Sequence, residues 1–369
     1  MAEASPLHAE NAVPAAALGP GRISVAEVLD ANALARGLSI WTVVACHIGL
    51  AHAFWKPIST FASAGKLAVS IFLFLSGLLL QLQANRADGR LAVGTWLRKR
   101  FFRIYPLYWT GLALTVLCAW HFHGRTFSAG VLAANFLGVE IWFSRQVVSS
   151  GYAVTFWFVS LLLLCYALFL PTRRIRRKEF LVLAAFALSF AALPSGRVMQ
   201  AAAFGFPAFF MGMAQADRLR RGGGAACDAR RHLAIFLPLL AALAFVFKGP
   251  NFIRMDGRWT LALDELGCVG LTLVPWPALV LVAWLQNALA RKAAAVLRAA
   301  LWISGLSFAV YCIHEPLLVA VDKSSAAGHP WWGLLGYALL VVGAGWVLDG
   351  LDRRLKNFVL APSRKDGIP

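Results

Sequence analysis

The sequence predicts an all-α membrane protein, a polytopic bundle of about ten transmembrane helices with both termini in the cytoplasm. Three observations lead to this fold class. The 369 residues are 60% hydrophobic and 14% charged, with a mean hydropathy of +0.68, and a water-soluble globule of this composition would expose a very large apolar surface. The apolar residues are grouped into segments of nearly membrane-spanning length. The basic residues are concentrated in alternate connections between those segments.

Ten apolar segments follow one another along the chain, and several are shorter than the roughly 20 residues of a typical membrane span. They cover residues 37–54, 67–84, 104–121, 154–170, 180–193, 200–216, 232–247, 268–288, 300–320 and 331–350. The segment 128–143 stays open as an eleventh span or a re-entrant or interfacial element. Residues 1–35 do not resemble a signal peptide, and we expect a flexible cytoplasmic tail with a short interfacial helix near residues 23–30. Residues 36–350 then form the membrane domain, and residues 351–369 form a basic cytoplasmic tail.

Lys and Arg residues divide unevenly between the two sides of this arrangement. Of the 35, 26 lie in the termini and in the connections after even-numbered segments, and nine lie in the other connections. The positive-inside rule therefore places both termini in the cytoplasm. Contacts with anionic lipid headgroups explain the net charge of +18. We expect no nucleic-acid partner, because no segment resembles a nucleic-acid reading module, and no metal site, because the six cysteines lack C-x-x-C spacing.

Ionisable residues inside the apolar segments are the best candidates for chemistry, because a charge in hydrocarbon costs several kcal/mol and is seldom retained without a role. His47 lies in the first segment and His314 in the ninth, where Glu315 follows it. Imidazole takes and returns a proton near neutral pH. A hydrogen bond to a neighbouring helix explains a lone membrane histidine equally well. Pro316 is expected to interrupt the ninth helix, so His314 or Glu315 could serve only to satisfy freed backbone groups.

Three arginines at or near the predicted cytoplasmic boundary are candidates to act together with His47. Arg36 precedes it by eleven residues, which is about 16 Å of helical rise and about half of the hydrocarbon core. Arg100 and Arg103, three residues apart, share one helical face at the predicted cytoplasmic boundary. Guanidinium groups suit phosphate oxygens, so the arginines could hold a phosphorylated donor while its reactive end reaches the histidine. The positive-inside signal is the competing explanation of these charges.

Six short motifs occur in a fixed order over about residues 30–350. They are Arg36 with ten intervening residues before His47, Val69-Ser70-Ile71-Phe72-Leu73-Phe74-Leu75-Ser76-Gly77, Arg100-Phe101-Phe102-Arg103-Ile104-Tyr105-Pro106, Trp157-Phe158-Val159-Ser160, Phe209-Phe210-Met211-Gly212, and Ser307-Phe308-Ala309-Val310-Tyr311-Cys312-Ile313-His314-Glu315-Pro316. In order and spacing this set resembles the acyltransferase-3 family of integral membrane acyltransferases. The chain resembles the stand-alone form, without the esterase-like domain that some relatives carry after the bundle.

The resemblance implies a ten-span enzyme that moves an acyl group from cytoplasmic acyl-coenzyme A, most often acetyl-CoA, to a hydroxyl of an extracytoplasmic carbohydrate. By position, His47 would be the catalytic base, and Arg36, Arg100 and Arg103 would support the coenzyme A site. Supporting roles stay open for a further set of residues that the motifs contain. They are Ser76, Trp157, His314 and Glu315.

The expected acceptor is a bacterial cell-surface polysaccharide or a lipid-linked glycan, reached from the inner membrane. The identity of the acceptor, the length of the acyl group and the oligomeric state stay open. Two positions depart from the family's pattern. Ala33 stands where the family often has Asp, and Leu162 stands where many relatives have an acidic residue. The carboxylates at these two positions are therefore not available to this chain.

Direct transfer in a ternary complex, with His47 removing the proton of the acceptor hydroxyl, is the expected mechanism. An acyl-enzyme would need Cys46 or Ser76 as nucleophile, but consecutive side chains such as Cys46 and His47 diverge by about 100° on a helix. A transporter or flippase with the buried histidines as a proton relay is the rival function. It would be favoured by inverted repeats with paired broken helices, which the sequence does not show. Another membrane acyltransferase architecture with a buried histidine is the second rival.

Overall fold

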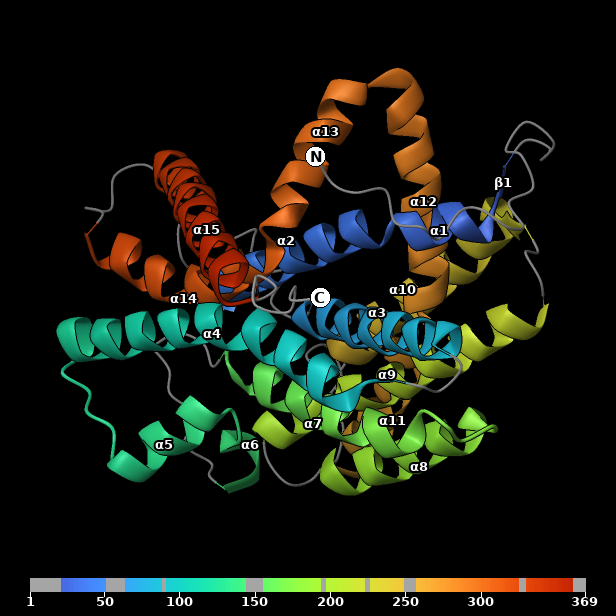
Figure 1. The fold of residues 1–369 in the computed structure, drawn as a ribbon, viewed down its shortest axis with the longest axis horizontal. Coiled ribbons are helices and arrows are strands. Elements are labelled where there is room, and N and C mark those ends of the chain that lie inside the picture. Colours follow the sequence, from blue (N-terminus) through green and yellow to red (C-terminus); the bar gives the residue numbers. More distant parts are fainter. Residues whose placement is uncertain are drawn as a thin grey trace, which may run out of the picture.

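The computed structural model describes residues 21–50, 64–87, 91–143, 155–193, 197–222, 226–248, 257–324 and 330–360. Within these ranges the protein is all-α, apart from the antiparallel pairing of the two-residue strands β1 (Arg22–Ile23) and β2 (Cys227–Asp228). Figure 1 shows the arrangement of the helices. They are α1 (Val25–Asp30), α2 (Asn32–Leu50), α3 (Gly65–Arg86), α4 (Val93–His123), α5 (Ala129–Leu137), α6 (Glu140–Phe143), α7 (Trp157–Thr172), α8 (Lys178–Ala192), α9 (Arg197–Gly222), α10 (Ala229–Lys248), α11 (Gly257–Leu273), α12 (Pro275–Lys292), α13 (Ala294–Gly305), α14 (Ser307–Ser324) and α15 (Pro330–Leu360).

Each predicted apolar segment coincides with one of these helices or with a bent pair of them, so the all-α class is confirmed. Within the described residues, α3, α4, α10 and α15 are each long and apolar enough to cross a membrane. Two bent pairs, α11–α12 at 42° and α13–α14 at 70°, raise the number of candidate spans to six. The count of ten spans and the cytoplasmic termini stay predictions.

The described part of the predicted N-terminal tail includes α1, at the place where a short helix was expected. Ser24 begins α1 with a capping box, in which its hydroxyl accepts a hydrogen bond from the Glu27 backbone N–H at 3.2 Å and the Glu27 carboxylate accepts one from the Ser24 N–H at 2.8 Å. Val28 is fully buried. The Asn287 amide of α12 donates to Glu27 at 2.9 Å. This short helix is therefore held on both its polar and its apolar face.

The structure also shows the course of the chain in two other segments, residues 351–360 and 128–143. Helix α15 continues to Leu360, so the first residues of the predicted C-terminal tail are helical, and Asp352 is 6% exposed. The segment 128–143 forms two short helices, α5 and α6. Ser128 caps the start of α5, and Gly138 ends it with a φ of 69°, a left-handed conformation that glycine adopts without strain.

The expectation that Pro316 interrupts the ninth helix is wrong. Helix α14 runs through Pro316, and the break lies ten residues earlier, at Leu306 between α13 and α14. Proline removes only one backbone donor, the partner of the Cys312 carbonyl. That carbonyl packs against Gly111 of α4, where an added Cβ would lie 2.3 Å from its oxygen. The Cys312 carbonyl, which lacks its usual helical partner, is thus covered by α4, and α14 continues past Pro316.

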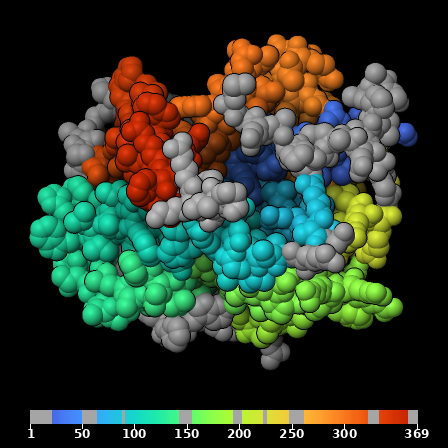
Figure 2. Space-filling view, in the orientation of Figure 1, coloured from blue at the N-terminus to red at the C-terminus, as the bar shows by residue number. Residues whose placement is uncertain are grey.

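Close backbone contact joins α3 to α9, the most extensive helix pairing in the described chain. A Cβ on Gly77 would lie 1.9 Å from the Phe209 carbonyl oxygen, and a Cβ on Gly212 would lie 2.1 Å from the Phe74 carbonyl oxygen. Small residues that let helix backbones approach are typical of membrane bundles. In the face shown in Figure 2, the dark blue segment of α2 lies recessed between the red, orange and cyan helices.

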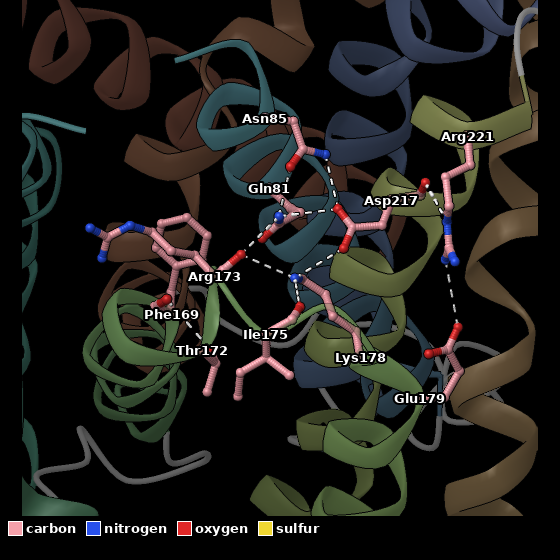
Figure 3. Close-up of polar contacts among 10 residues, drawn as sticks. All are labelled: Gln81, Asn85, Phe169, Thr172, Arg173, Ile175, Lys178, Glu179, Asp217 and Arg221. Atoms are coloured by element: carbon pink, nitrogen blue, oxygen red, sulfur yellow. Dashed lines mark hydrogen bonds and ion pairs between the residues drawn. The ribbon is translucent and has the colours of Figure 1, made fainter. Parts of the chain in front are cut away.

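A polar network ties the turn between α7 and α8 to the ends of α3 and α9 (Figure 3). Lys178, 2% exposed, pairs with Asp217 at 3.0 Å and donates to the Ile175 carbonyl at 2.8 Å. Gln81 donates to Asp217 at 3.1 Å, and Asn85 donates to the same carboxylate at 2.9 Å. The buried ammonium is thus fully compensated, and the network fixes the last turns of α3, which carry Gln81 and Asn85.

Candidate functional site

His47 and His314 meet, although 267 residues separate them in the chain. The Nδ1 atom of His47 on α2 lies 2.6 Å from Nε2 of His314 on α14. Their ring planes are 8° apart and their centroids 4.9 Å apart, so the rings lie edge to edge, as a hydrogen bond between ring nitrogens requires. His314 is fully buried, whereas His47 is partly exposed. The sequence named both residues but did not pair them.

The hydrogen bonds of His314 set the proton positions of the pair. Its Nδ1 lies 2.8 Å from the Tyr311 carbonyl oxygen and 3.2 Å from the Val310 carbonyl oxygen. A carbonyl only accepts, so this Nδ1 carries a proton, and in the neutral ring Nε2 is then an acceptor. His47 Nδ1 must therefore donate to it, which leaves Nε2 of His47 with a free lone pair. The arrangement can act as a general base whose tautomer is fixed by a second histidine.

The three predicted arginines gather on the same side of the bundle. Arg36 of α2 interacts electrostatically with Arg103 and Arg100 of α4, and with Tyr166 of α7. Arg36 lies eleven residues before His47, about 16 Å along the helix. Like charges held together repel one another, so a bound anion would relieve this repulsion. The cluster can therefore hold phosphate groups, with the histidine pair deeper in the bundle.

Arg100 has the most defined surroundings of the three. Its guanidinium donates to the Gln83 amide oxygen of α3 at 3.2 Å. The same group lies over the rings of Trp96 and Tyr166, 5.6 and 5.7 Å from their centroids. Stacking on aromatic faces restricts the guanidinium without neutralising its charge. Its Nε makes no hydrogen bond among the described residues, which leaves a donor for a ligand.

Gln83, Tyr166 and Tyr311 complete this region, and the sequence interpretation did not single them out. Gln83 and Tyr166 are polar groups in otherwise apolar segments, a signal that was available in the sequence. Tyr311 contributes the carbonyl that binds His314. Only the fold shows that they touch the candidate residues.

The four supporting candidates differ in their placement. Ser76 is partly buried on α3, and within the described chain it makes no hydrogen bond to either histidine. Trp157 begins α7 and packs against the main core. Glu315 is fully buried and interacts with Cys118 of α4 and with α15. His314 alone joins His47 directly.

Cys46 is directed away from the histidine pair. Its Sγ atom faces Gly65 at the start of α3, where an added Cβ would lie 2.8 Å from the sulfur. His47 contacts α14 instead. Within the described ranges, no group of three or more His, Cys, Asp or Glu side chains is placed to hold a metal ion.

Comparison with known proteins identifies the family. The profile of a family described as an acyltransferase domain, acyltransferase-3, matches residues 31–350. No curated protein and no solved structure matches the chain. The matched region includes both histidines and the three arginines, which favours an enzyme over the rival transporter. The chain therefore belongs to the acyltransferase-3 family, and the protein is a membrane acyltransferase.

Proposed function

We propose that the protein is an O-acyltransferase of the bacterial inner membrane that moves an acyl group, with acetyl as the first choice, from cytoplasmic acyl-CoA to a hydroxyl of an extracytoplasmic carbohydrate. A cell-surface polysaccharide or a lipid-linked glycan would be the acceptor. The single observation that carries the proposal is the base formed by His47 and His314 above an arginine cluster. A phosphate-bearing donor and a hydroxyl acceptor are the two substrates that such an arrangement serves.

In the proposed reaction, Nε2 of His47 takes the proton of the acceptor hydroxyl while that oxygen attacks the thioester carbonyl. The new C–O bond forms, the C–S bond breaks, and the proton passes from His47 to the leaving coenzyme A thiolate. His314 acts as a positioning residue, because its Nε2 accepts the hydrogen bond from His47 Nδ1 and stabilises the imidazolium. Arg36, Arg100 and Arg103 bind the phosphates of the donor.

Direct transfer needs no enzyme nucleophile, and the placement of Cys46 against α3 is consistent with this. Incubation of the purified protein with radiolabelled acetyl-CoA alone is expected to leave no label on the chain. A labelled serine or cysteine would instead indicate a two-step reaction with an acyl-enzyme.

The test of the function combines a gene deletion with complementation. Deletion is expected to remove O-acetyl signals from the envelope polysaccharide in NMR spectra, and the wild-type gene restores them. His47→Ala should restore nothing detectable, a loss of at least about 100-fold, because general-base catalysis contributes roughly 10²–10⁴-fold. Purified His47→Ala should bind coenzyme A as the wild type does in calorimetry, because the arginines are intact.

His314 and a control histidine make the test specific. His314→Gln keeps an acceptor that can face His47 Nδ1 and should retain more activity than His314→Leu, which cannot orient the ring. His232 on α10, whose Nδ1 lies 2.7 Å from the Asp228 carbonyl oxygen of its own chain segment, serves as the control and should tolerate alanine. Full activity of His47→Ala together with no binding of coenzyme A would refute the proposal.

A further inference from the structure

Glu140 is a buried acid to which the proposed reaction assigns no role. It is fully buried at the start of α6, and both carboxylate oxygens lack a well-formed hydrogen bond among the described residues. The Ser160 hydroxyl of α7 faces this carboxylate. The side-chain oxygens of Ser160 and Thr155 are also buried, and neither makes a well-formed hydrogen bond among the described residues. Burial of a polar group without a hydrogen bond costs free energy, more so for a carboxylate, so four such oxygens require an explanation.

This cluster adjoins the histidine pair through Tyr311. The Tyr311 hydroxyl donates to the Thr155 backbone carbonyl at 2.5 Å, and its ring lies 6.1 Å from the His314 ring between centroids. Tyr311 also interacts electrostatically with Glu140. The Tyr311 ring therefore lies between these oxygens and His314, the hydrogen-bond partner of the proposed base His47.

The Glu140 carboxylate and the arginines lie beside different parts of α4. Tyr108, which interacts electrostatically with Glu140, donates to the Asn135 carbonyl of α5 and is fully buried. It follows Arg100 by eight residues, about 12 Å of helical rise. Glu140 and Thr155 also flank the connection 144–154, which the charge pattern predicts to be extracytoplasmic. With this predicted topology, the carboxylate would lie on the side of the bundle from which an extracytoplasmic acceptor arrives.

We propose that Glu140, with the hydroxyls of Ser160 and Thr155, forms a subsite that binds two neighbouring hydroxyl groups of the acceptor. Each of the two carboxylate oxygens accepts a hydrogen bond from one acceptor hydroxyl. The Ser160 and Thr155 hydroxyls make the remaining hydrogen bonds of these two acceptor hydroxyls. The ligand class is a carbohydrate with vicinal hydroxyls. This inference rests on the proposed O-acyltransferase function, because it assigns the substrate of the same site.

The experiment uses the full chain in lipid nanodiscs, with radiolabelled acetyl-CoA as donor and methyl α-D-glucopyranoside as a simple vicinal-hydroxyl probe. Glu140→Gln keeps the shape of the side chain and removes its charge. It should raise the KM for the glucoside about tenfold and leave the Kd for coenzyme A within twofold. Ser160→Ala should raise the same KM by a smaller factor. Glu179→Gln changes a carboxyl that is 47% exposed on α8 and should leave both constants unchanged.

Melting temperature separates binding from a structural role. Because the Glu140 carboxylate makes no well-formed hydrogen bond among the described residues, and the amide of Gln could still face the Ser160 hydroxyl, Glu140→Gln should melt at or above the wild-type temperature. A lower melting temperature with an unchanged KM for the glucoside would overturn the subsite. Wild-type protein that binds coenzyme A but neither binds nor acetylates the glucoside would also overturn it, while leaving the proposed function in place. Failure to bind coenzyme A would count against the proposed function itself.

Discussion

At the residue scale, the histidine pair gives each ring a separate task. His314 is held by backbone carbonyls of its own helix, so its protonation pattern does not depend on a substrate. His47 receives its orientation from His314 and is the partly exposed member. A neutral histidine in place of a carboxylate orients the base without introducing a buried charge, which an apolar bundle would stabilise poorly.

Arg100 provides the residue-scale prediction about the donor. Arg100→Gln should weaken binding of coenzyme A about tenfold, which corresponds to about 1.4 kcal/mol, because one guanidinium contact with phosphate is lost. Binding of dephospho-coenzyme A, which lacks the 3′-phosphate, shows whether the lost contact involves that group. If it does, Arg100→Gln should weaken the binding of dephospho-coenzyme A less than the binding of coenzyme A. Lys99→Gln removes an exposed charge from the same helix and should change the affinity by less than twofold. Equal effects of the two substitutions would indicate a general charge effect.

At the element scale, two helix breaks shape the second half of the bundle. Pro275 follows Val274 and begins α12, where a missing backbone N–H costs nothing, and the chain bends there by 42°. The α13–α14 break lies at Leu306, and it allows α14 to direct His314 towards α2. These bent pairs follow one another in the chain, and they do not form the two separated inverted halves that a transporter would favour.

Gly77 provides the element-scale prediction. Gly77→Ala would place a Cβ 1.9 Å from the Phe209 carbonyl oxygen, so α3 and α9 must separate. Overpacking of this kind costs about 1–3 kcal/mol, more than the roughly 1 kcal/mol that alanine gains over glycine in a helix. The melting temperature in detergent should therefore fall. Gly343 of α15 has no atom within 4 Å of its added Cβ, and Gly343→Ala should leave the melting temperature unchanged or raise it slightly.

At the scale of the whole molecule, charge and fold agree on how the substrates would approach. The arginine cluster involves the first halves of α2 and α4, and Tyr108, which interacts with Glu140, follows Arg100 by about 12 Å along α4. The histidine pair adjoins the Glu140 cluster through Tyr311. Such an order supports a donor that enters from one face of the membrane and an acceptor that enters from the other.

Cysteine labelling tests the predicted topology. In a chain whose six native cysteines are replaced, Ala327→Cys lies between the ninth and tenth apolar segments and should react with a membrane-impermeant maleimide in intact spheroplasts. Gly223→Cys, between the sixth and seventh segments, should react only after the membrane is opened. Reaction of both cysteines in intact spheroplasts would be incompatible with ten spans and cytoplasmic termini.

The sequence by itself indicated a membrane environment, the all-α class, the approximate positions of ten apolar helical segments and the family. Composition and hydropathy depend on residue type alone, and the order of the motifs can be read along the chain without knowledge of the fold. It also supplied His47, Arg36, Arg100 and Arg103 as candidates, because charge in an apolar segment is visible at once. Their roles stay proposals.

The tertiary structure alone decided the contacts. Nothing in the sequence pairs His47 with a residue 267 positions away, places Gln83 against Arg100, or shows that Glu140 is buried. It also decided that α14 passes through Pro316, because the freed Cys312 carbonyl packs against α4. The physical reason is common to all of these. Helix formation and membrane preference are local properties of the chain, whereas burial, tautomers and charge clusters depend on which helix faces meet.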